Sequence, residues 1–349
     1  MTSPDNLRAP DKTDTKPAPI RLSRRWQPWV LLGLLVAVFV LSLFWGRYPR
    51  VGFLPLANLS NDPLAAQLVW NLRLPRLLAA VLIGMSLASA GMVFQMVFSN
   101  PLVEPGFLGV SQAAAFGAAF SIVFLNGAAW LVQGSAVLFG LLGLASSYAL
   151  ARRVRYGGWV LRLLLAGIAV SAMFSAGVGL LKYLADPMRQ LPEITFWLLG
   201  GLYSITWQRL LSALPLILVG LLVIYLMRWR LNLVSLEDDV AFSLGIAVNR
   251  ERLLILVAAV AVTATSISIS GLIGWAGLIV PHLARRLAGA DSRYSIPISM
   301  LFGAVFMVVC DNLARTLLAG EVPLGILTSL VGALTFLFLM TRPQMRFHA

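Results

Sequence analysis

Charged residues are scarce in this chain: 12% of its 349 residues are Asp, Glu, Lys or Arg, whereas 59% are hydrophobic. Soluble globular proteins usually carry about 25% charged residues, so the composition excludes an ordinary soluble domain. Cysteine occurs once, at Cys310. A single cysteine excludes an intramolecular disulfide and a thiolate metal site, and we expect it to pack as a small apolar side chain.

Signatures of catalysis are also missing. The sequence has no glycine-rich loop ending in Gly-Lys-Ser or Gly-Lys-Thr, so it cannot hydrolyse ATP by that route. His282 and His348 are far apart, and neither a metal-type His/Cys spacing nor a Ser/His/Asp arrangement stands out. We therefore expect a chain that is not an enzyme, with no catalytic residue, no cofactor and no metal site.

Long apolar runs are abundant. Each is near the ~20 residues that a helix needs to cross about 30 Å of hydrocarbon. They predict an all-α polytopic membrane protein with about ten transmembrane helices in one bundle, at residues 29–46, 74–98, 107–127, 129–151, 159–184, 208–227, 252–270, 271–288, 296–318 and 323–340. Two pairs of runs are barely separated, so nine or eleven spans are alternatives.

The net charge of +13 is distributed unevenly along the chain. With the N-terminus in the cytoplasm, 19 of the 27 Lys and Arg residues fall on the cytoplasmic side of this topology. That excess is the positive-inside bias of membrane proteins. It predicts a bacterial inner-membrane protein with both termini in the cytoplasm, whose basic residues contact anionic lipid rather than nucleic acid.

The chain divides into one membrane domain and two tails. Residues 1–28 are polar and include Pro10, Pro17 and Pro19, which predicts a disordered cytoplasmic tail. Residues 29–341 form the membrane domain, and residues 342–349 form a second cytoplasmic tail. Ser23-Arg24-Arg25 also fits a twin-arginine export signal, but the apolar run after it lacks a small-residue cleavage site, so we expect a retained first span.

The segment from Asn100 to Ser111, with the sequence NPLVEPGFLGVS, interrupts two apolar runs with two prolines, two glycines and a carboxylate. Backbone this irregular cannot face lipid, because each unpaired N–H or C=O costs several kcal/mol in hydrocarbon. It must be buried in protein or line a wet cavity, and in membrane proteins such segments often mark a transport path. For Glu104 we expect a role in capping nearby helix N-termini rather than a substrate contact.

Residues 232–252 form the longest polar stretch between spans and lie on the cytoplasmic side of this topology. Acidic and basic residues surround an apolar core that contains Val240, Phe242 and Leu244. The pattern suits one or two short amphipathic helices. A solvated connector is the simpler interpretation, but the apolar content favours a docking surface for a soluble partner.

Arginines lie near the outer ends of two spans, at Arg73 and Arg315. Asp311 and Arg315 have the i,i+4 spacing of a local ion pair on one helix. Arginines near helix ends also commonly extend toward the membrane surface. Alternatively, these guanidinium groups receive carboxylates of a partner, because arginine binds carboxylate in a bidentate way. The sequence alone leaves these alternatives open.

Taken in order, the motifs resemble the permease family of bacterial ABC importers for iron–siderophore complexes, haem and cobalamin, with a BtuC-like permease fold. The likeness covers nearly everything after the N-terminal tail. The matching residues are Arg73-Leu74-Pro75-Arg76, Gln95, Asn100-Pro101-Leu102, Glu104-Pro105-Gly106, Leu108-Gly109-Val110-Ser111, Leu244-Gly245, Gly274, Gly277-Leu278-Ile279-Val280-Pro281-His282, Arg285, Asp311, Arg315, Glu321-Val322-Pro323-Leu324-Gly325 and Gly332-Ala333.

The resemblance implies a homodimer or a pair of homologous permeases, two ATP-binding subunits and a periplasmic substrate-binding protein. It implies that Arg73 and Arg315 receive acidic residues of the binding protein, and that Asn100 and Leu102 narrow the cytoplasmic end of the path. It also implies that a short coupling helix contacts the ATPase through Asp238, Ala241, Phe242, Leu244 and Gly245.

The sequence departs from the family pattern at four places. Glu237 replaces a usual glycine, Leu334 replaces a usual proline, and Trp275-Ala276 stands where Phe-Val is common. Some family members have hydroxyl residues where this chain has Tyr156-Gly157-Gly158. We therefore expect the gate at the cytoplasmic end of the path to close differently in this chain.

The predicted function is therefore a permease subunit that forms the path for an iron–siderophore-type chelate. Haem, cobalamin or an oxyanion such as molybdate are alternative cargoes. An ion-coupled secondary transporter would need intramembrane carboxylates for an ion site, and only Glu104 and Asp311 approach that. A membrane scaffold without transport activity is a further alternative.

Overall fold

The computed structural model describes residues 26–47, 52–55, 62–236, 238–245, 247–318 and 320–341. The tails predicted at the two ends fall mostly outside these ranges, as does Glu237. In the described part the helices are α1 (Gln27–Phe44), α3 (Pro63–Gln67), α4 (Leu74–Val97), α5 (Val110–Phe124), α6 (Ala129–Arg153), α7 (Trp159–Leu184), α8 (Gln190–Leu199), α9 (Trp207–Leu226), α10 (Arg228–Val234), α11 (Asp238–Ser243), α12 (Val248–Ser270), α13 (Ala276–Ala288), α14 (Ser292–Thr316) and α15 (Leu324–Met340).

Short irregular elements are also present among the described residues. A π-helical turn, Leu68–Arg73, joins α3 to α4 without a break, and a 3-10 turn, Pro105–Leu108, precedes α5. Strands β1 (Trp45–Gly46) and β2 (Gly52–Phe53) pair antiparallel after α1.

Each of the ten predicted spans contains one helix, so the all-α polytopic prediction is confirmed for the described residues. In the described part of the chain, seven helices are long and apolar enough to cross a membrane, counting α3 and α4 as one; α5 and α15 are shorter apolar helices. Helix α13 has only 13 residues. It begins at Ala276 rather than at residue 271, because Gly271 and Trp275 adopt positive φ angles that a helix does not allow.

Helices α4 and α12 form the centre of the bundle and are buried along most of their length. Small residues let α4 touch its neighbours through the backbone. A Cβ atom on Gly84 would lie 2.2 Å from the Gly303 carbonyl oxygen of α14, and one on Gly91 would lie 1.9 Å from that of Gly277 in α13. Such close approach is how helices pack in lipid, where no hydrophobic driving force operates between them.

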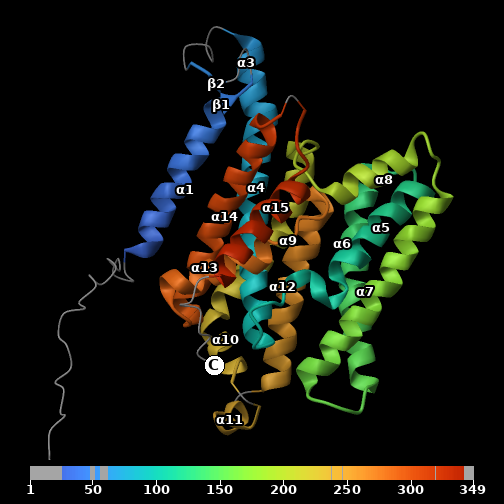
Figure 1. Cartoon of the computed structure of the whole chain (residues 1–349), viewed down its shortest axis with the longest axis vertical. Helices are drawn as coiled ribbons and strands as arrows, with labels where there is room; N and C mark the ends of the chain where they lie inside the picture. The colour runs from blue at the N-terminus through green and yellow to red at the C-terminus, as the bar shows by residue number, and fades with distance from the viewer. Residues whose placement is uncertain are drawn as a thin grey trace, which may run out of the picture.

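The two ends of the bundle carry different elements (Figure 1). Strands β1 and β2, helix α3 and helix α8 lie at one end, which we call the outer end. Helix α11 and the connection between α6 and α7 lie at the opposite end, which we call the inner end. The segments that the sequence predicts for partner contact are thus placed at opposite ends of one helical bundle.

Candidate functional site

The connection between α4 and α5 is irregular but held by its neighbours. Ser99 has a φ of 47°, and Gly109, with a φ of 79°, leads into α5. The Ser147 hydroxyl of α6 donates to the Leu108 carbonyl at 2.9 Å, and Val103 and Leu108 are buried. Surrounding helices therefore shelter part of this broken backbone, as lipid could not.

Asn100 and Leu102, the predicted gate residues, form one tight turn just beyond α4. The Asn100 Oδ1 accepts from the Leu102 backbone N–H at 2.9 Å, and the Asn100 N–H donates to the Gln95 carbonyl at 3.0 Å. This side-chain-closed turn fixes the direction of the chain. The Leu102 side chain is left 51% exposed, so it is free to contact another subunit or cargo.

Glu104 caps a helix start, as the sequence predicts. Its Oε2 accepts from the backbone N–H of Trp275, which lies immediately before α13, at 3.4 Å. Trp275 has a φ of 68°, an unusual conformation for a bulky residue. Its ring packs edge-on against Phe336 of α15, with ring centroids 6.1 Å apart. The carboxylate thus holds the start of α13 and the broken segment together.

Four charged groups form an ion-pair chain at the outer end, and three of them, Arg76, Asp311 and Arg315, are largely buried. Arg76 Nε lies 2.7 Å from Asp311 Oδ1, and Arg315 Nε lies 3.0 Å from Asp311 Oδ2. Asp311 is fully buried. Arg76 Nη1 also lies 2.8 Å from Glu321, in the connection between α14 and α15. The local Asp311–Arg315 pair is present, and Arg76 extends it across to α4.

Arg73 and Arg315 do not project freely from the surface. Arg73 is 8% exposed, and its Nη1 donates to the Leu43 carbonyl at the end of α1. The two arginines line a pocket of about 460 Å³, which we call the outer arginine pocket; it is lined by Gly46, Arg47, Leu68, Leu72, Arg73, Arg76, Leu202, Tyr203, Ile205, Arg315 and Glu321. The lining contains four guanidinium groups and one carboxylate, so the pocket is positively charged. A carboxylate of a partner protein would have to enter this pocket to reach Arg73 and Arg315.

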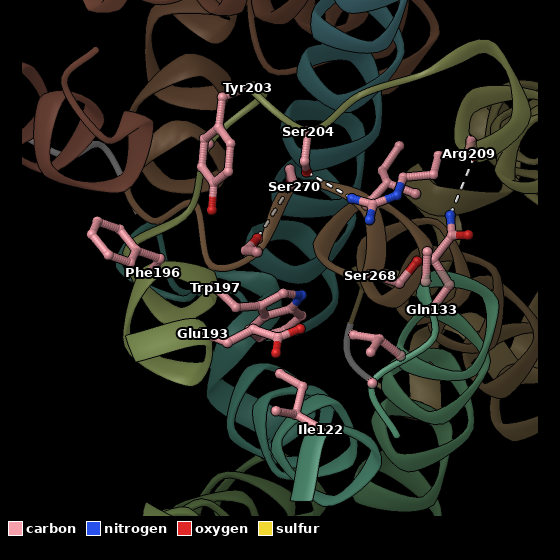
Figure 2. A pocket seen from close by; sticks show the side chains of 16 residues that line it. Ile122, Gln133, Glu193, Phe196, Trp197, Tyr203, Ser204, Arg209, Ser268 and Ser270 are labelled. Carbon is pink, nitrogen blue, oxygen red and sulfur yellow. Dashed lines mark hydrogen bonds between the residues drawn. The ribbon is translucent and has the colours of Figure 1, made fainter. Parts of the chain in front are cut away.

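A second outer pocket, which we call the outer polar pocket, lies between α5, α6, α8, α9 and α12 (Figure 2). Its volume is about 230 Å³, and its polar lining includes Gln133, Glu193, Tyr203, Ser204, Arg209, Ser268 and Ser270. Arg209 donates to the Ser204 hydroxyl at 2.7 Å. Partial burial raises the pKa of the Tyr203 phenol above its ordinary value, which keeps it protonated. Tyr203 also lines the outer arginine pocket, so the two pockets adjoin.

The sequence alone did not identify these pockets as units. Arg76 and Asp311 were noted within motifs, yet the contact between them joins residues 235 positions apart. The lining of the outer polar pocket comes from five helices, so no local pattern reveals it.

The predicted coupling segment is helical, with α10 and α11 at the inner end. Ala241 is fully buried, Leu244 is 58% exposed, and Gly245 has a φ of 79°. Asp238 and Phe242 lie in α11, but their side chains are outside the described set. The short helix therefore has one face on the bundle, and Leu244 beyond it is uncovered.

Helix α10 ties the coupling segment to the membrane helices. Asn232 donates to Asp291 Oδ1 at 2.8 Å and accepts from the Ser292 backbone N–H at 2.9 Å, at the start of α14. Arg230 forms an ion pair with Glu251 of α12. A displacement of α10 would therefore be transmitted to α12 and α14.

Three of the four family departures lie in the described part of the chain, at Leu334, at Tyr156-Gly157-Gly158 and at Trp275-Ala276. Leu334 is 59% exposed on α15, and Tyr156 is 67% exposed in the inner connection. Gly157 has a φ of 78° there, which suits glycine. The ring of Trp275 packs beside Gly332.

Membrane-length helices, a sheltered break and charged pockets at one end define a polytopic membrane protein of the transporter class. Residues 34–342 match the sequence model of the FecCD transport family. The molybdate import system permease protein MolB of Haemophilus influenzae is 39% identical over 319 residues, which cover 88% of this chain and 94% of MolB. The hemin transport system permease protein HmuU of Yersinia pestis is 38% identical over 330 residues, covering 93% and 98%.

Solved structures agree with this assignment. A structure described as an ABC transporter of the metal-chelate type, in an inward-facing conformation, matches with a TM-score of 0.83 and 38% identity. The match covers 90% of this chain and 98% of that chain. The chain belongs to the FecCD transport family. It is a membrane-spanning permease subunit of an ABC importer, a kind of subunit that is not itself catalytic and works with ATPase and binding-protein partners.

Proposed function

We propose that this permease pairs with a copy of itself or a homologous permease and forms the translocation path for a metal chelate of the iron–siderophore type. A periplasmic binding protein delivers the cargo at the outer end, and two ATP-binding subunits act at the inner end. Both termini lie in the cytoplasm, which accords with the excess of basic residues on that side. Cargo affinity resides mainly in the binding protein.

One observation supports this proposal above the others: the outer arginine pocket and α11 lie at opposite ends of one continuous bundle. The outer pocket has the charge to receive acidic side chains, and Val240 and Leu244 offer apolar surface at the inner end, being 47% and 58% exposed. Helix α14 spans the distance, from Ser292 beside α10 to Arg315 in the pocket.

Pairing of two permeases is supported by an uncovered face on α7. Small residues repeat along it at Ala169, Ala172, Ala176 and Gly179, and each is exposed. Small-residue faces allow close packing of helices from separate subunits in lipid. Met173 and Leu180 on the same face are also exposed, so a partner subunit or a cargo path would cover an apolar surface.

The docking role of the outer arginine pocket predicts a charge-dependent contact. Replacing Arg73 with Glu should weaken binding of the cognate binding protein at least ten-fold at low salt, because like charges then meet. Arg189→Glu, an exposed outer arginine outside the pocket, is the matched control and should change affinity less than three-fold. Equal affinity of wild type and Arg73→Glu would contradict the docking role.

Cargo is tested by uptake into proteoliposomes that contain the permease, its ATPase and its binding protein. The proposal expects uptake of a ferric siderophore chelate and poor uptake of haemin, cobalamin and molybdate. The names of the relatives include molybdate, hemin, iron chelatin and cobalamin, so all four cargoes belong in one competition series. Selective uptake of molybdate would overturn the chelate assignment while leaving the importer intact.

A further inference from the structure

A further pocket at the inner end lies beside the α6–α7 connection, and its lining includes Asn249 from the C-terminal part of the predicted coupling stretch 232–252. It has a volume of about 420 Å³ and opens between α6, α7 and α12. We call it the inner basic pocket; its lining residues are Tyr148, Ala151, Arg152, Trp159, Arg162 and Asn249. Two guanidinium groups and no carboxylate are present among them.

Among the described residues, nothing neutralises the positive charge of this pocket. No described carboxylate lies within ion-pair distance of Arg152 or Arg162. Arg162 Nη1 donates to the Val154 carbonyl at 3.3 Å, whereas its Nε is shielded from solvent and lacks a hydrogen-bond partner. Glu251, near Asn249 on α12, is paired with Arg230 instead.

Neighbouring residues add to the positive potential. Arg153 follows Arg152 in the last turn of α6, and α7 and α12 both begin beside the pocket, at Trp159 and one residue before Asn249. A helix N-terminus carries partial positive charge and a C-terminus partial negative charge, so the starts of α7 and α12 together with the arginines outweigh the end of α6 at Arg153. The pocket therefore favours a ligand with concentrated negative charge.

The aromatic wall of the pocket is fixed in place. The Trp159 ring stacks on Phe98, with centroids 6.0 Å apart, and the Arg252 guanidinium lies 4.7 Å from its centroid. Tryptophan is enriched where headgroups meet hydrocarbon. Leu150 and Leu161, on the helices that frame the pocket, are 39% and 46% exposed, which provides apolar surface next to the charged groups.

We propose that the inner basic pocket binds the phosphate of an anionic phospholipid of the cytoplasmic leaflet, such as phosphatidylglycerol or cardiolipin. Guanidinium groups bind phosphate through bidentate, charge-assisted hydrogen bonds. Basic pockets between transmembrane helices on this side suit such headgroups. The phosphate lies between Arg152 and Arg162, and the acyl chains follow the exposed leucines. A lipid held there fixes the α6–α7 connection, which contains Tyr156 and Gly157, against α12.

Native mass spectrometry of the purified full chain tests the site. Titration with phosphatidylglycerol should show a tightly bound lipid, and Arg152→Gln with Arg162→Gln should weaken it about ten- to thirty-fold, from roughly 1 kcal/mol per basic residue. Phosphatidylcholine binding should not change. Arg286→Gln with Arg293→Gln removes the same charge at the same end of the bundle and should change affinity less than two-fold.

Two further measurements separate loss of charge from misfolding, and a bound lipid from a bound phosphate ion. The variant Arg152→Lys with Arg162→Lys keeps the charge and should retain binding within about five-fold, as expected if charge rather than folding is responsible. Inorganic phosphate in millimolar excess should leave phosphatidylglycerol bound. Displacement by phosphate would assign a soluble phosphate ligand instead, and equal losses in the pocket and control variants would overturn the site. Neither cargo nor ATPase is needed, so the result is independent of the proposed transport function.

Discussion

The outer and inner ends of this bundle differ in how their charged and apolar groups are satisfied. At the outer end, Asp311 is fully buried between Arg76 and Arg315, and the chain itself supplies ion-pair partners for all three groups. At the inner end, α11 has six residues, and Leu244 beyond it is 58% exposed. The outer end is therefore preorganised, whereas the inner end presents a small surface that needs a partner to cover it.

This difference suits a permease in which a partner bound at the inner end changes the arrangement of the helices up to the outer end. A buried ion-pair chain holds α4, α14 and the start of α15 in one arrangement. The inner segment is tied to α14 and α12 by a few polar contacts from Asn232 and Arg230. An ATPase that binds α11 can therefore bias the bundle between two arrangements, provided that it binds one of them better.

The largest effect is expected when the outer ion-pair chain of Arg76, Asp311, Arg315 and Glu321 is broken. Asp311→Ala leaves the buried Arg315 guanidinium without its carboxylate partner and Arg76 with only the half-exposed Glu321, and it should cost about 3–5 kcal/mol of stability. Glu321→Ala is the matched control, because it removes the other carboxylate partner of Arg76 at a site 44% exposed; it should cost about 1 kcal/mol or less. Thermal unfolding in detergent measures both, and similar losses would show that the outer ion-pair chain is not preorganised by burial.

The inner end should respond in the opposite way. Leu244→Glu should leave stability unchanged within about 0.5 kcal/mol, because the side chain is exposed. It should weaken ATPase binding about ten-fold or more, since a charge would be buried in an apolar contact. Leu287→Glu, 49% exposed at the inner end of α13, is the control. Stability measurements and pull-down of the ATPase separate the two effects.

The smallest effect concerns the broken segment between the two ends. Glu104→Gln keeps an acceptor for the Trp275 N–H and should cost less than about 0.5 kcal/mol, whereas Glu104→Leu leaves that group unpaired and should cost about 1–2 kcal/mol. Transport should persist in Glu104→Gln, because the role is structural. Loss of transport with unchanged stability would instead indicate a proton- or ion-binding role for this carboxylate.

Local patterns predicted the helical framework well. Apolar runs identified a helix in each of ten spans, because length and hydropathy suffice to specify a membrane helix. The role of Glu104 followed from its place among prolines and glycines, although its partner, Trp275, is 171 residues away. The start of α13 was placed five residues early, because the apolar residues before Ala276 gave no sign that Trp275 adopts a positive φ.

Contacts between distant residues could not be predicted in the same way. The sequence indicated the Asp311–Arg315 pair from its i,i+4 spacing, but not Arg76, which comes from another helix. The burial of Arg73 depends on packing against Leu43 and Gly46 at the end of α1. The inner basic pocket combines three helices, and nothing in the spacing of Arg152, Arg162 and Asn249 indicates that they meet.

The central claim is that the outer arginine pocket and α11 communicate through the bundle. The direct measurement is the ATPase rate of the reconstituted transporter, with and without the binding protein at the outer end. We predict that loaded binding protein stimulates hydrolysis in wild type and in Arg189→Glu, and that Arg73→Glu and Leu244→Glu each abolish the stimulation. Undiminished stimulation in both of these variants would contradict the account.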